Sequence, residues 1–209
     1  KGGCNSDDSY GVDINRNFDF VHGDPAGASN DPCDSDYHGV SPESEPETVA
    51  VSNYAKSIFP ESQRKKNPGA QWNVPFGEDI TGLYADIHSS GGYVYYPWGH
   101  ANKVSPDDEA LQAIGRKVNS FNNYKIWAGG QPDYMYAASG DGSDYMYAVL
   151  GVASLGFEIG DDFYQNCNKM DGIVDINLPA LMYTASIAKA PYKQVKGPDV
   201  FDVDVDNSG

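Results

Sequence analysis

Two polar residues that can hold a carboxylate lie next to each other early in the chain. Residues 11–17 read Gly-Val-Asp-Ile-Asn-Arg-Asn, a short polar stretch with no apolar period. An arginine offers two parallel charged donors to a carboxylate, and a neighbouring asparagine amide adds a third. Asn15 and Arg16 are therefore candidate ligands of a substrate carboxylate, weighed against an ordinary surface turn.

His88 and Glu158 each stand at the end of an apolar stretch. The stretches are Leu83–His88 and Val152–Ile159, and their length and composition favour buried strands. Ligands of α/β sheets bind beyond the carboxyl ends of the strands, so the two side chains are predicted to meet there. An imidazole at such a place is a common metal ligand, and burial gives a glutamate the raised pKa of a general base.

A glycine-rich loop precedes the second of these strands. Its residues Tyr136–Asp144 read Tyr-Ala-Ala-Ser-Gly-Asp-Gly-Ser-Asp, and a tyrosine on such a loop can close over a bound substrate. A metal site needs further ligands beside His88. No His-x-x-Glu, His-x-x-His or Glu-x-x-His pair surrounds any of the histidines, so this sequence offers one candidate zinc ligand.

The elements that must position these residues alternate between strands and helices, which predicts an α/β layered fold. A helix is expected from Ser44, with Ser44 as its cap, Glu47 completing a capping box and Pro60 ending it. Its predicted apolar face is Ala50, Val51, Tyr54, Ala55 and Ile58. The other expected elements are an extended Tyr93–Trp98, a helix from Ser105 with Leu111, Ile114, Val118 and Phe121 on one face, and a short helix Ser143–Leu150. A last helix is expected over Ile176–Ala188, with Leu178, Leu181, Met182, Ala185 and Ala188 inward, while residues 61–80 and 127–142 read as loops.

The chain is strongly acidic, with 30 Asp and Glu against 14 Lys and Arg among 209 residues and a net charge of −16. A surface that binds nucleic acid needs clustered basic residues, and none is visible. No apolar run reaches the ~18 residues that a membrane span needs. We therefore expect neither nucleic acid nor a membrane as a partner. The acidity suits a secreted protein, extracellular or periplasmic, and it suits equally a protein in which acidity only aids solubility.

Three cysteines are present, and their spacings match no zinc finger. Cys4 and Cys33 flank the Asn-Arg stretch and could close it as a disulfide, which requires an oxidising compartment. In that case Cys167 is unpaired or pairs outside this chain. The alternative is three free thiols.

In combination these features resemble the zinc metallocarboxypeptidases of the carboxypeptidase A type, in their secreted bacterial branch. The matching blocks are Gly11–Phe18, Ser44–Thr48, Ile87–Ser89 with Tyr96-Pro97, Tyr136–Asp144 and Phe157-Glu158. The resemblance implies a mixed, mostly parallel β-sheet flanked by helices. Residues 1–196 would be the C-terminal part of the catalytic domain, with the N-terminal half of the sheet missing. Residues 197–209 would form a linker and the start of a C-terminal β-domain.

The resemblance also implies hydrolysis of the C-terminal peptide bond of peptides or proteins. Asn15 and Arg16 would hold the terminal carboxylate, and Tyr136 would close over the terminal residue. His88 would be one of three ligands of a Zn²⁺ ion, and Glu158 would take a proton from the zinc-bound water. The family's other two ligands, a His-x-x-Glu pair, lie upstream of the Asn-Arg block. The chain alone is therefore expected to be inactive, and the N-terminal half of the same enzyme, as a separate chain, is an expected partner.

The residue preference is expected to depend on the loop before Glu158. The position that aligns with Ser143 is apolar in family members that cut before aromatic or aliphatic ends, and Asp in those that remove Lys or Arg. Asp141, two residues earlier, matches an acid that some broad-specificity bacterial members carry. The resemblance thus implies a mixed pocket, formed in part by Asp141 and Ser143, with some preference for basic ends.

Three alternatives remain at this point. A peptide-binding pseudo-enzyme of the same fold would keep Asn15 and Arg16 but lack metal, although it would have no use for a base at Glu158. A carboxypeptidase acting on bacterial cell-wall peptides fits the same residues. An acidic calcium-binding or adhesive module is supported only by the Asp-rich tail, and no calcium loop of the expected spacing is present.

Overall fold

The computed structural model describes residue 4 and residues 11–129 and 136–195. Its strands are β1 (Leu83–His88), β2 (Tyr93–Tyr96), β3 (Lys125–Ala128) and β4 (Ala153–Glu158). Its α-helices are α1 (Pro46–Ile58), α2 (Pro68–Gln71), α3 (Asp108–Asn122), α4 (Gly142–Ala148), α5 (Cys167–Ile187) and α6 (Pro191–Gln194), with 3₁₀ turns η1 (Ile14–Arg16) and η2 (Glu61–Gln63). The expected linker and tail, residues 197–209, lie outside the described residues.

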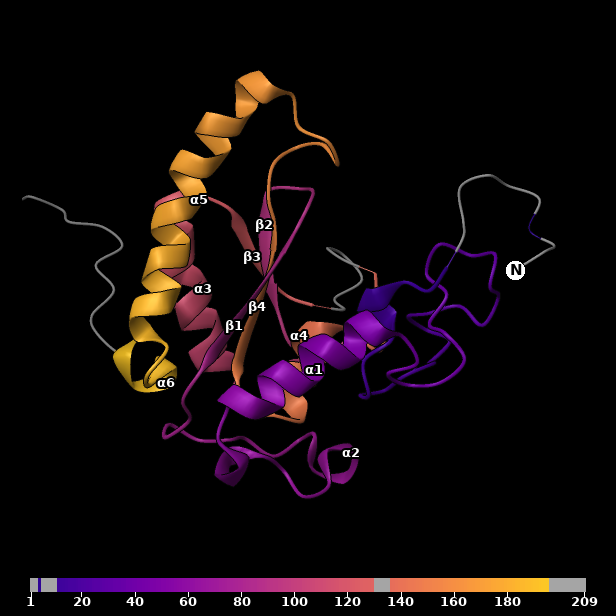
Figure 1. The fold of residues 1–209 in the computed structure, drawn as a ribbon. Coiled ribbons are helices and arrows are strands. Elements are labelled where there is room, and N and C mark those ends of the chain that lie inside the picture. Colours follow the sequence, from indigo (N-terminus) through magenta and orange to yellow (C-terminus); the bar gives the residue numbers. More distant parts are fainter. Residues whose placement is uncertain (1–3, 5–10, 130–135, 196–209) are drawn as a thin grey trace, which may run out of the picture.

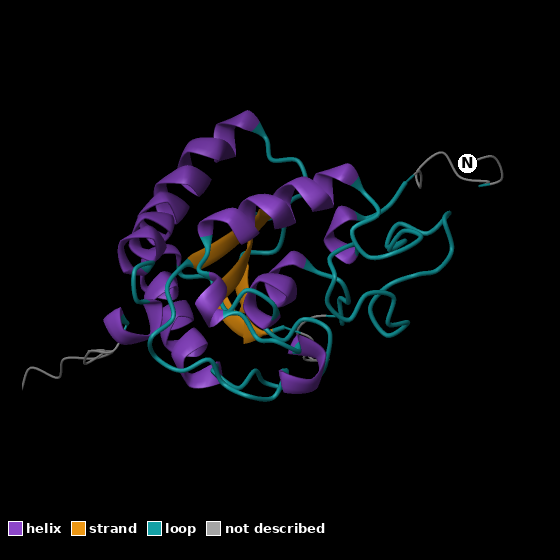
Figure 2. Ribbon diagram, turned by 60° about the horizontal axis from the view of Figure 1, so that its bottom comes forward, coloured by secondary structure: helices purple, strands orange, loops and turns teal. Residues whose placement is uncertain are grey.

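The four strands form one sheet in the order β1-β4-β2-β3. β1 pairs with β4 and β2 with β3 in parallel, while β2 runs antiparallel to β4. Helices α3 and α5 lie on one side of this sheet and α1 and α4 on the other (Figure 1), and Figure 2 shows the strands enclosed by helices. The predicted mixed, mostly parallel sheet flanked by helices is confirmed. Residues Ala153–Phe157 are all buried, as expected for a central strand covered on both faces.

The edge strands of the sheet are β1 and β3. β1 pairs with β4 on one side, and on its other side it has no partner strand among the described residues. Beside it, α5 and the sheet leave an apolar groove of about 160 Å³. The groove is lined by Ile87, Phe157, Ile159, Met170, Ile173, Val174, Asn177, Leu178 and Leu181. Nothing in the described part of the chain has the length and apolar character of a membrane-spanning helix.

The prediction for the start and buried face of α1 is wrong in two respects. The helix begins at Pro46 with Glu45 at the cap position, and no side chain caps it. The Ser44 hydroxyl makes other contacts: it accepts from the Asn17 amide at 3.0 Å and donates to Glu45 at 3.0 Å. The buried face consists of Thr48, Ser52 and Ala55, whereas Val51, Tyr54 and Ile58 of the predicted face are exposed.

The last helix also differs from its prediction. α5 begins at Cys167, nine residues before the predicted Ile176, and continues through Pro179. Its buried residues are Asn177, Ala180, Thr184 and Ile187, while Leu178 and Met182 of the predicted inward face are exposed. Small and polar residues face the core here because α5 packs closely on α3, and the apolar side faces the groove beside β1.

Smaller corrections concern residues read as loops or core. The region 127–142 contains the end of β3, and the region 61–80 contains η2 and α2. In α3, Leu111, Ile114 and Val118 are buried as predicted, whereas Phe121 is 43% exposed and packs against Tyr183 in a tilted arrangement with ring centroids 5.7 Å apart.

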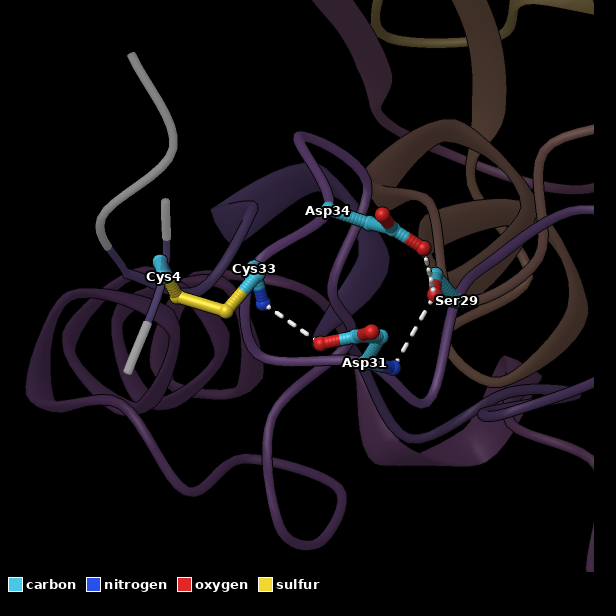
Figure 3. The surroundings of a disulfide bond; sticks show 5 residues. All are labelled: Cys4, Ser29, Asp31, Cys33 and Asp34. Atoms are coloured by element: carbon cyan, nitrogen blue, oxygen red, sulfur yellow. Dashed lines mark hydrogen bonds between the residues drawn. A yellow bond between two sulfur atoms is a disulfide. The ribbon is translucent and has the colours of Figure 1, made fainter. Parts of the chain in front are cut away.

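The predicted disulfide is confirmed: Cys4 and Cys33 are bonded, and Cys167 is exposed and free within the described residues. Figure 3 shows how the segment around Cys33 is ordered. Asp31 accepts from the Cys33 amide at 2.9 Å, and Ser29 accepts from the Asp31 amide at 3.0 Å and donates to Asp34 at 2.5 Å. The crosslink closes the long segment that surrounds η1.

A buried carboxylate joins the loop before α3 to α4. Asp107 Oδ2 accepts from the Tyr147 hydroxyl at 2.6 Å and from the Phe76 amide at 3.0 Å. Tyr147→Phe removes the first donor, so we expect the free energy of unfolding to fall by about 1–3 kcal/mol. Tyr192→Phe is the matched control, because that buried hydroxyl has no hydrogen-bond partner among the described residues. Urea unfolding of both variants measures the difference, and equal losses would contradict the prediction.

Candidate active site

The Asn-Arg stretch folds as the 3₁₀ turn η1, and Asp13 organises it. Asp13 caps the turn by accepting from the Asn15 amide at 2.9 Å. Arg16 is only 7% exposed, and its Nη1 donates to the Asn15 carbonyl at 2.9 Å and lies 3.7 Å from Asp13 Oδ2. Its Nε is buried without a hydrogen-bond partner among the described residues. A buried guanidinium with a spare donor is suited to bind an anion.

The turn is fixed against the loop before α4, which is far away in the sequence. Asn15 Oδ1 accepts from the Gly142 amide at 2.9 Å, and the Phe18 amide donates to the Gly140 carbonyl at 3.0 Å. A Cβ on Gly140, whose φ is +70°, would lie 2.2 Å from the Arg16 carbonyl oxygen, so this approach requires glycine. Because the Asn15 oxygen is occupied, its amide hydrogens remain for a ligand.

His88 and Glu158 meet at the edge of the sheet, as the sequence predicts. They are paired in register at the carboxyl ends of the parallel strands β1 and β4. Both line a cavity of about 210 Å³ together with Asn15 and Arg16. Burial raises the pKa of Glu158, the nearby His88 opposes this rise, and Asp86 adds to it. The arrangement therefore places a carboxylate suited to accept a proton next to an anion-binding turn.

Asp86 is a residue of this site that the sequence reasoning missed. It lies two residues before His88, so both side chains project from the same face of β1. Its Oδ2 is 3.0 Å from His88 Nε2, and this contact is the main reason that the pKa of His88 is raised, against the opposing effect of burial. The sequence did contain a signal for this contact. Side chains two residues apart on a strand share a face, so Asp86 could have been predicted to lie beside His88.

Asp141 gives the cavity an unusual acidic group. One oxygen, Oδ1, accepts from the Ser143 and Asp144 amides at 2.6 and 3.2 Å and caps α4. The other, Oδ2, is buried and has no hydrogen-bond partner within the described residues, although the side chain lines the cavity. Burial, and then the nearby Asp144, raise the pKa of Asp141 well above its usual range. An uncompensated carboxyl group at this place can be satisfied by a ligand that donates hydrogen bonds or carries positive charge.

Of the other predicted site residues, Tyr136 lines the cavity and Ser143 does not. Tyr136 lines the cavity, is 69% exposed, and its ring centroid lies 5.8 Å from Arg16 Cζ. Ser143 is buried in the first turn of α4, next to Tyr95, and it is Tyr95 that lines the cavity. The complete lining is Asp13, Asn15, Arg16, His88, Ser89, Tyr95, Gly99, Tyr136, Ala138, Asp141, Glu158 and Phe163.

The fit of a metal ion can be judged from the donors present. In the part of the chain that the structure describes, no three His, Cys, Asp or Glu side chains could hold a metal together. His88 has the surroundings of a single metal ligand, because a carboxylate contacts one ring nitrogen and the ring lines the cavity. The described residues thus fit one ligand of a metal site and do not complete it.

The sequence is similar to those of known carboxypeptidases. The family model described as zinc carboxypeptidase matches residues 1–171. Carboxypeptidase A1 of Mus musculus is 30% identical over 155 residues, which are 72% of this chain and 32% of that protein. Carboxypeptidase O of Bos taurus is 30% identical over 165 residues, covering 76% of this chain and 38% of that protein.

Solved structures agree on the fold. The crystal structure of thrombin activatable fibrinolysis inhibitor has a TM-score of 0.68 at 26% identity, covering 88% of this chain and 44% of that one. The carboxypeptidase A from Helicoverpa armigera has a TM-score of 0.65 at 22% identity, covering 86% and 42%. The chain therefore spans between 32% and 44% of the length of these four proteins.

Proposed function

The chain belongs to the zinc carboxypeptidase family, and we propose that the whole protein hydrolyses the C-terminal peptide bond of peptides or proteins. The observation that carries the proposal is the cavity that Arg16 and Glu158 share. Arg16 binds an anion, and Glu158 accepts a proton. A peptide's last residue presents a carboxylate on one side and the scissile bond on the other, so it matches both groups.

Binding of the substrate is assigned to the turn η1. The Arg16 guanidinium pairs with the terminal carboxylate, and the Asn15 amide donates to the same group. This role is supported by the burial of Arg16 and by the contact of Asn15 with Gly142, which orients the amide. Tyr136 lies beside Arg16 at the cavity and covers the terminal residue. Because the clamp reads a free carboxylate, the protein acts as an exopeptidase.

Proton transfer is assigned to Glu158. The carboxylate accepts a proton from the attacking water and returns it to the leaving amine, so that the peptide bond breaks as the new carboxylate forms. The role is supported by the partial burial that raises the pKa of Glu158. His88, at the same position along the adjacent strand, serves as one zinc ligand, with the remaining ligands supplied from outside the described residues. Zinc bound there would polarise the scissile carbonyl and lower the pKa of water.

The pocket for the terminal side chain is assigned to Asp141 and Ser143. Asp141 Oδ2, which has no partner among the described residues, can accept hydrogen bonds from a Lys or Arg side chain. The positive charge of that side chain would also offset the cost of burying the Asp141 carboxylate. Tyr95 provides an aromatic wall, so apolar ends also fit. We therefore propose a mixed preference in which basic terminal residues are favoured.

The open side of the sheet is assigned to the N-terminal half of the catalytic domain, on a separate chain or on the same polypeptide. The assignment is supported by the edge of β1, which is unpaired within the described residues, and by the apolar groove between β1 and α5. An extracellular or periplasmic location is supported by the Cys4–Cys33 disulfide.

A peptide panel tests the proposed function. The whole protein is incubated with peptides that differ only in the last residue (Phe, Leu, Lys or Arg) and with the same peptides carrying a C-terminal amide. Mass spectrometry should show loss of one residue from the free acids, fastest for Lys and Arg, with the amides resistant. A chelator should abolish the loss, and added zinc should restore it. Internal cleavage, equal cleavage of the amides, or indifference to chelation would each contradict the proposal.

A further inference from the structure

The first part of the loop after β2 is held to α4 by the buried carboxylate of Asp144. Asp144 lies in the first turn of α4, and its side chain is 2% exposed. Its Oδ1 accepts from the Gly99 amide at 2.9 Å. Its Oδ2 contacts the His100 backbone amide at 3.0 Å and the His100 ring Nδ1 at 2.6 Å. One side chain thus fixes two consecutive residues of the loop.

The His100 ring is itself held in place by three aromatic rings. Its centroid lies 5.4 Å from that of Phe20, 5.1 Å from Trp98 and 6.3 Å from Trp72, all in edge-to-face arrangements. The side chain is 11% exposed. The ring therefore has little freedom to turn away from Asp144, and the contact between Nδ1 and Oδ2 persists as part of the packed structure.

The same loop forms the wall opposite the Asp141 carboxylate. A Cβ built on Gly99 would lie 2.6 Å from Asp141 Oδ2, the oxygen that has no partner in the described structure. Gly129 supports the loop from behind, since a Cβ there would lie 2.9 Å from Gly99 Cα. Gly99 and Asp141 both line the cavity. A shift of the loop by about one ångström would therefore either press Gly99 onto Asp141 Oδ2 or widen the space beside that oxygen.

We propose that Asp144 and His100 are positioning residues of the terminal-residue pocket: they hold Gly99 against Asp141 and so set the space beside the buried, unpartnered carboxylate oxygen that a basic side chain would contact. The inference rests on the proposed carboxypeptidase function and deepens it by naming what sets the residue preference. Neither residue lines the cavity, as far as the described residues define it, so they act through Gly99 and Asp141. The two acids at the start of α4 make different contacts. Both oxygens of Asp144 accept hydrogen bonds from the loop, whereas only Oδ1 of Asp141 accepts from the backbone of α4 and Oδ2 is left for the ligand.

Two substitutions at His100 separate its hydrogen bond from its packing. His100→Phe keeps an aromatic ring among Phe20, Trp72 and Trp98 but removes the Nδ1 donor. His100→Asn keeps a donor at a similar distance from the backbone but removes the ring. The measured quantity is the ratio of kcat/KM for a Lys-ended peptide to that for the matching Phe-ended peptide, with the whole protein. Thermal unfolding of each variant is recorded alongside.

We expect His100→Phe to lower this ratio about tenfold, the size of one lost hydrogen bond to a charged group. His100→Asn should keep the ratio within about twofold, even where its stability falls more. A residue with only a structural role would change both substrates equally and leave the ratio unaltered. If His100→Phe does not fold, Asp144→Asn is measured in its place, with the same expected fall.

The outcomes distinguish this inference from the proposed function. If the wild-type protein releases neither Lys nor Phe, the proposed function is wrong. If it releases both and Asp141→Asn leaves the ratio unchanged, the assignment of the pocket to Asp141 is wrong. If Asp141→Asn lowers the ratio while His100→Phe and Asp144→Asn do not, or if His100→Asn lowers it as much as His100→Phe, the positioning role is overturned.

Discussion

Glu158→Gln is expected to lower kcat for the release of C-terminal residues by about 10²- to 10⁴-fold, the usual contribution of a general base. Glutamine has the size of glutamate and still accepts hydrogen bonds, but it cannot take up a proton at neutral pH. Glu158 is suited to this role because burial raises its pKa and because it pairs in register with His88. Steady-state kinetics of the whole protein with a Lys-ended peptide give the measurement.

Substrate binding is the control in this experiment. The groups assigned to the terminal carboxylate are untouched, so the Kd of the peptide for Glu158→Gln should stay within about threefold of the wild-type value. Asp161→Asn, which neutralises an exposed carboxylate on the loop after β4, should leave kcat unchanged. A Glu158→Gln variant that keeps more than a tenth of the wild-type kcat would remove Glu158 from the proposed mechanism. A wild-type protein that binds the peptide without releasing its last residue would instead favour a binding protein of the same fold.

Arg16→Met is expected to lower kcat/KM for free-acid peptides by about 30-fold or more, the effect of removing one partner of a buried charge pair. Methionine fills part of the same volume and packs in the same buried place, but it offers no donor. The loss should appear mainly in KM if the arginine binds the carboxylate equally in the ground state and the transition state. Arg16→Lys should recover part of the affinity only, since an ammonium group cannot provide two parallel donors.

The comparison of acid and amide substrates makes this prediction specific to the carboxylate. The wild-type protein should prefer the free acid over the C-terminal amide, and Arg16→Met should lose most of that preference while its rate on the amide stays the same. Arg116→Met, on the far helix α3, controls for the removal of a positive charge from an acidic protein. If Arg16→Met slows the acid and the amide by the same factor, Arg16 does not read the terminal carboxylate.

Local patterns in the sequence were sufficient to predict the two strands that end in His88 and Glu158. Leu83–His88 is β1 as predicted, and the second stretch contains β4 within one residue at each end. Both are short apolar runs bounded by polar or glycine residues, a signal that depends little on distant contacts. The meeting of His88 and Glu158 also followed from sequence, because parallel neighbouring strands bring their carboxyl ends to one edge.

Predictions of which helix face is buried failed where the partner surface could not be known. In α1 and α5 the apolar residues point partly away from the described core, and small or polar residues pack inward. A hydrophobic period identifies a face that seeks a partner, yet it does not say which partner. The capping box failed because the helix begins one residue later than predicted, with Glu45 at the cap position, while Ser44 contacts Asn17 from a segment far away in the sequence.

The sequence by itself determined the residue types of the site, the two strands that end in His88 and Glu158, and the turn that contains Asn15 and Arg16. These depend on side-chain chemistry and on short-range backbone preference. Only the tertiary structure decided that Gly140 and Gly142 dock on that turn, that Asp86 contacts His88, and that Asp144 holds the loop beside Asp141. Each of these depends on burial and on distances of a few ångströms between distant segments, which no pattern within one segment specifies.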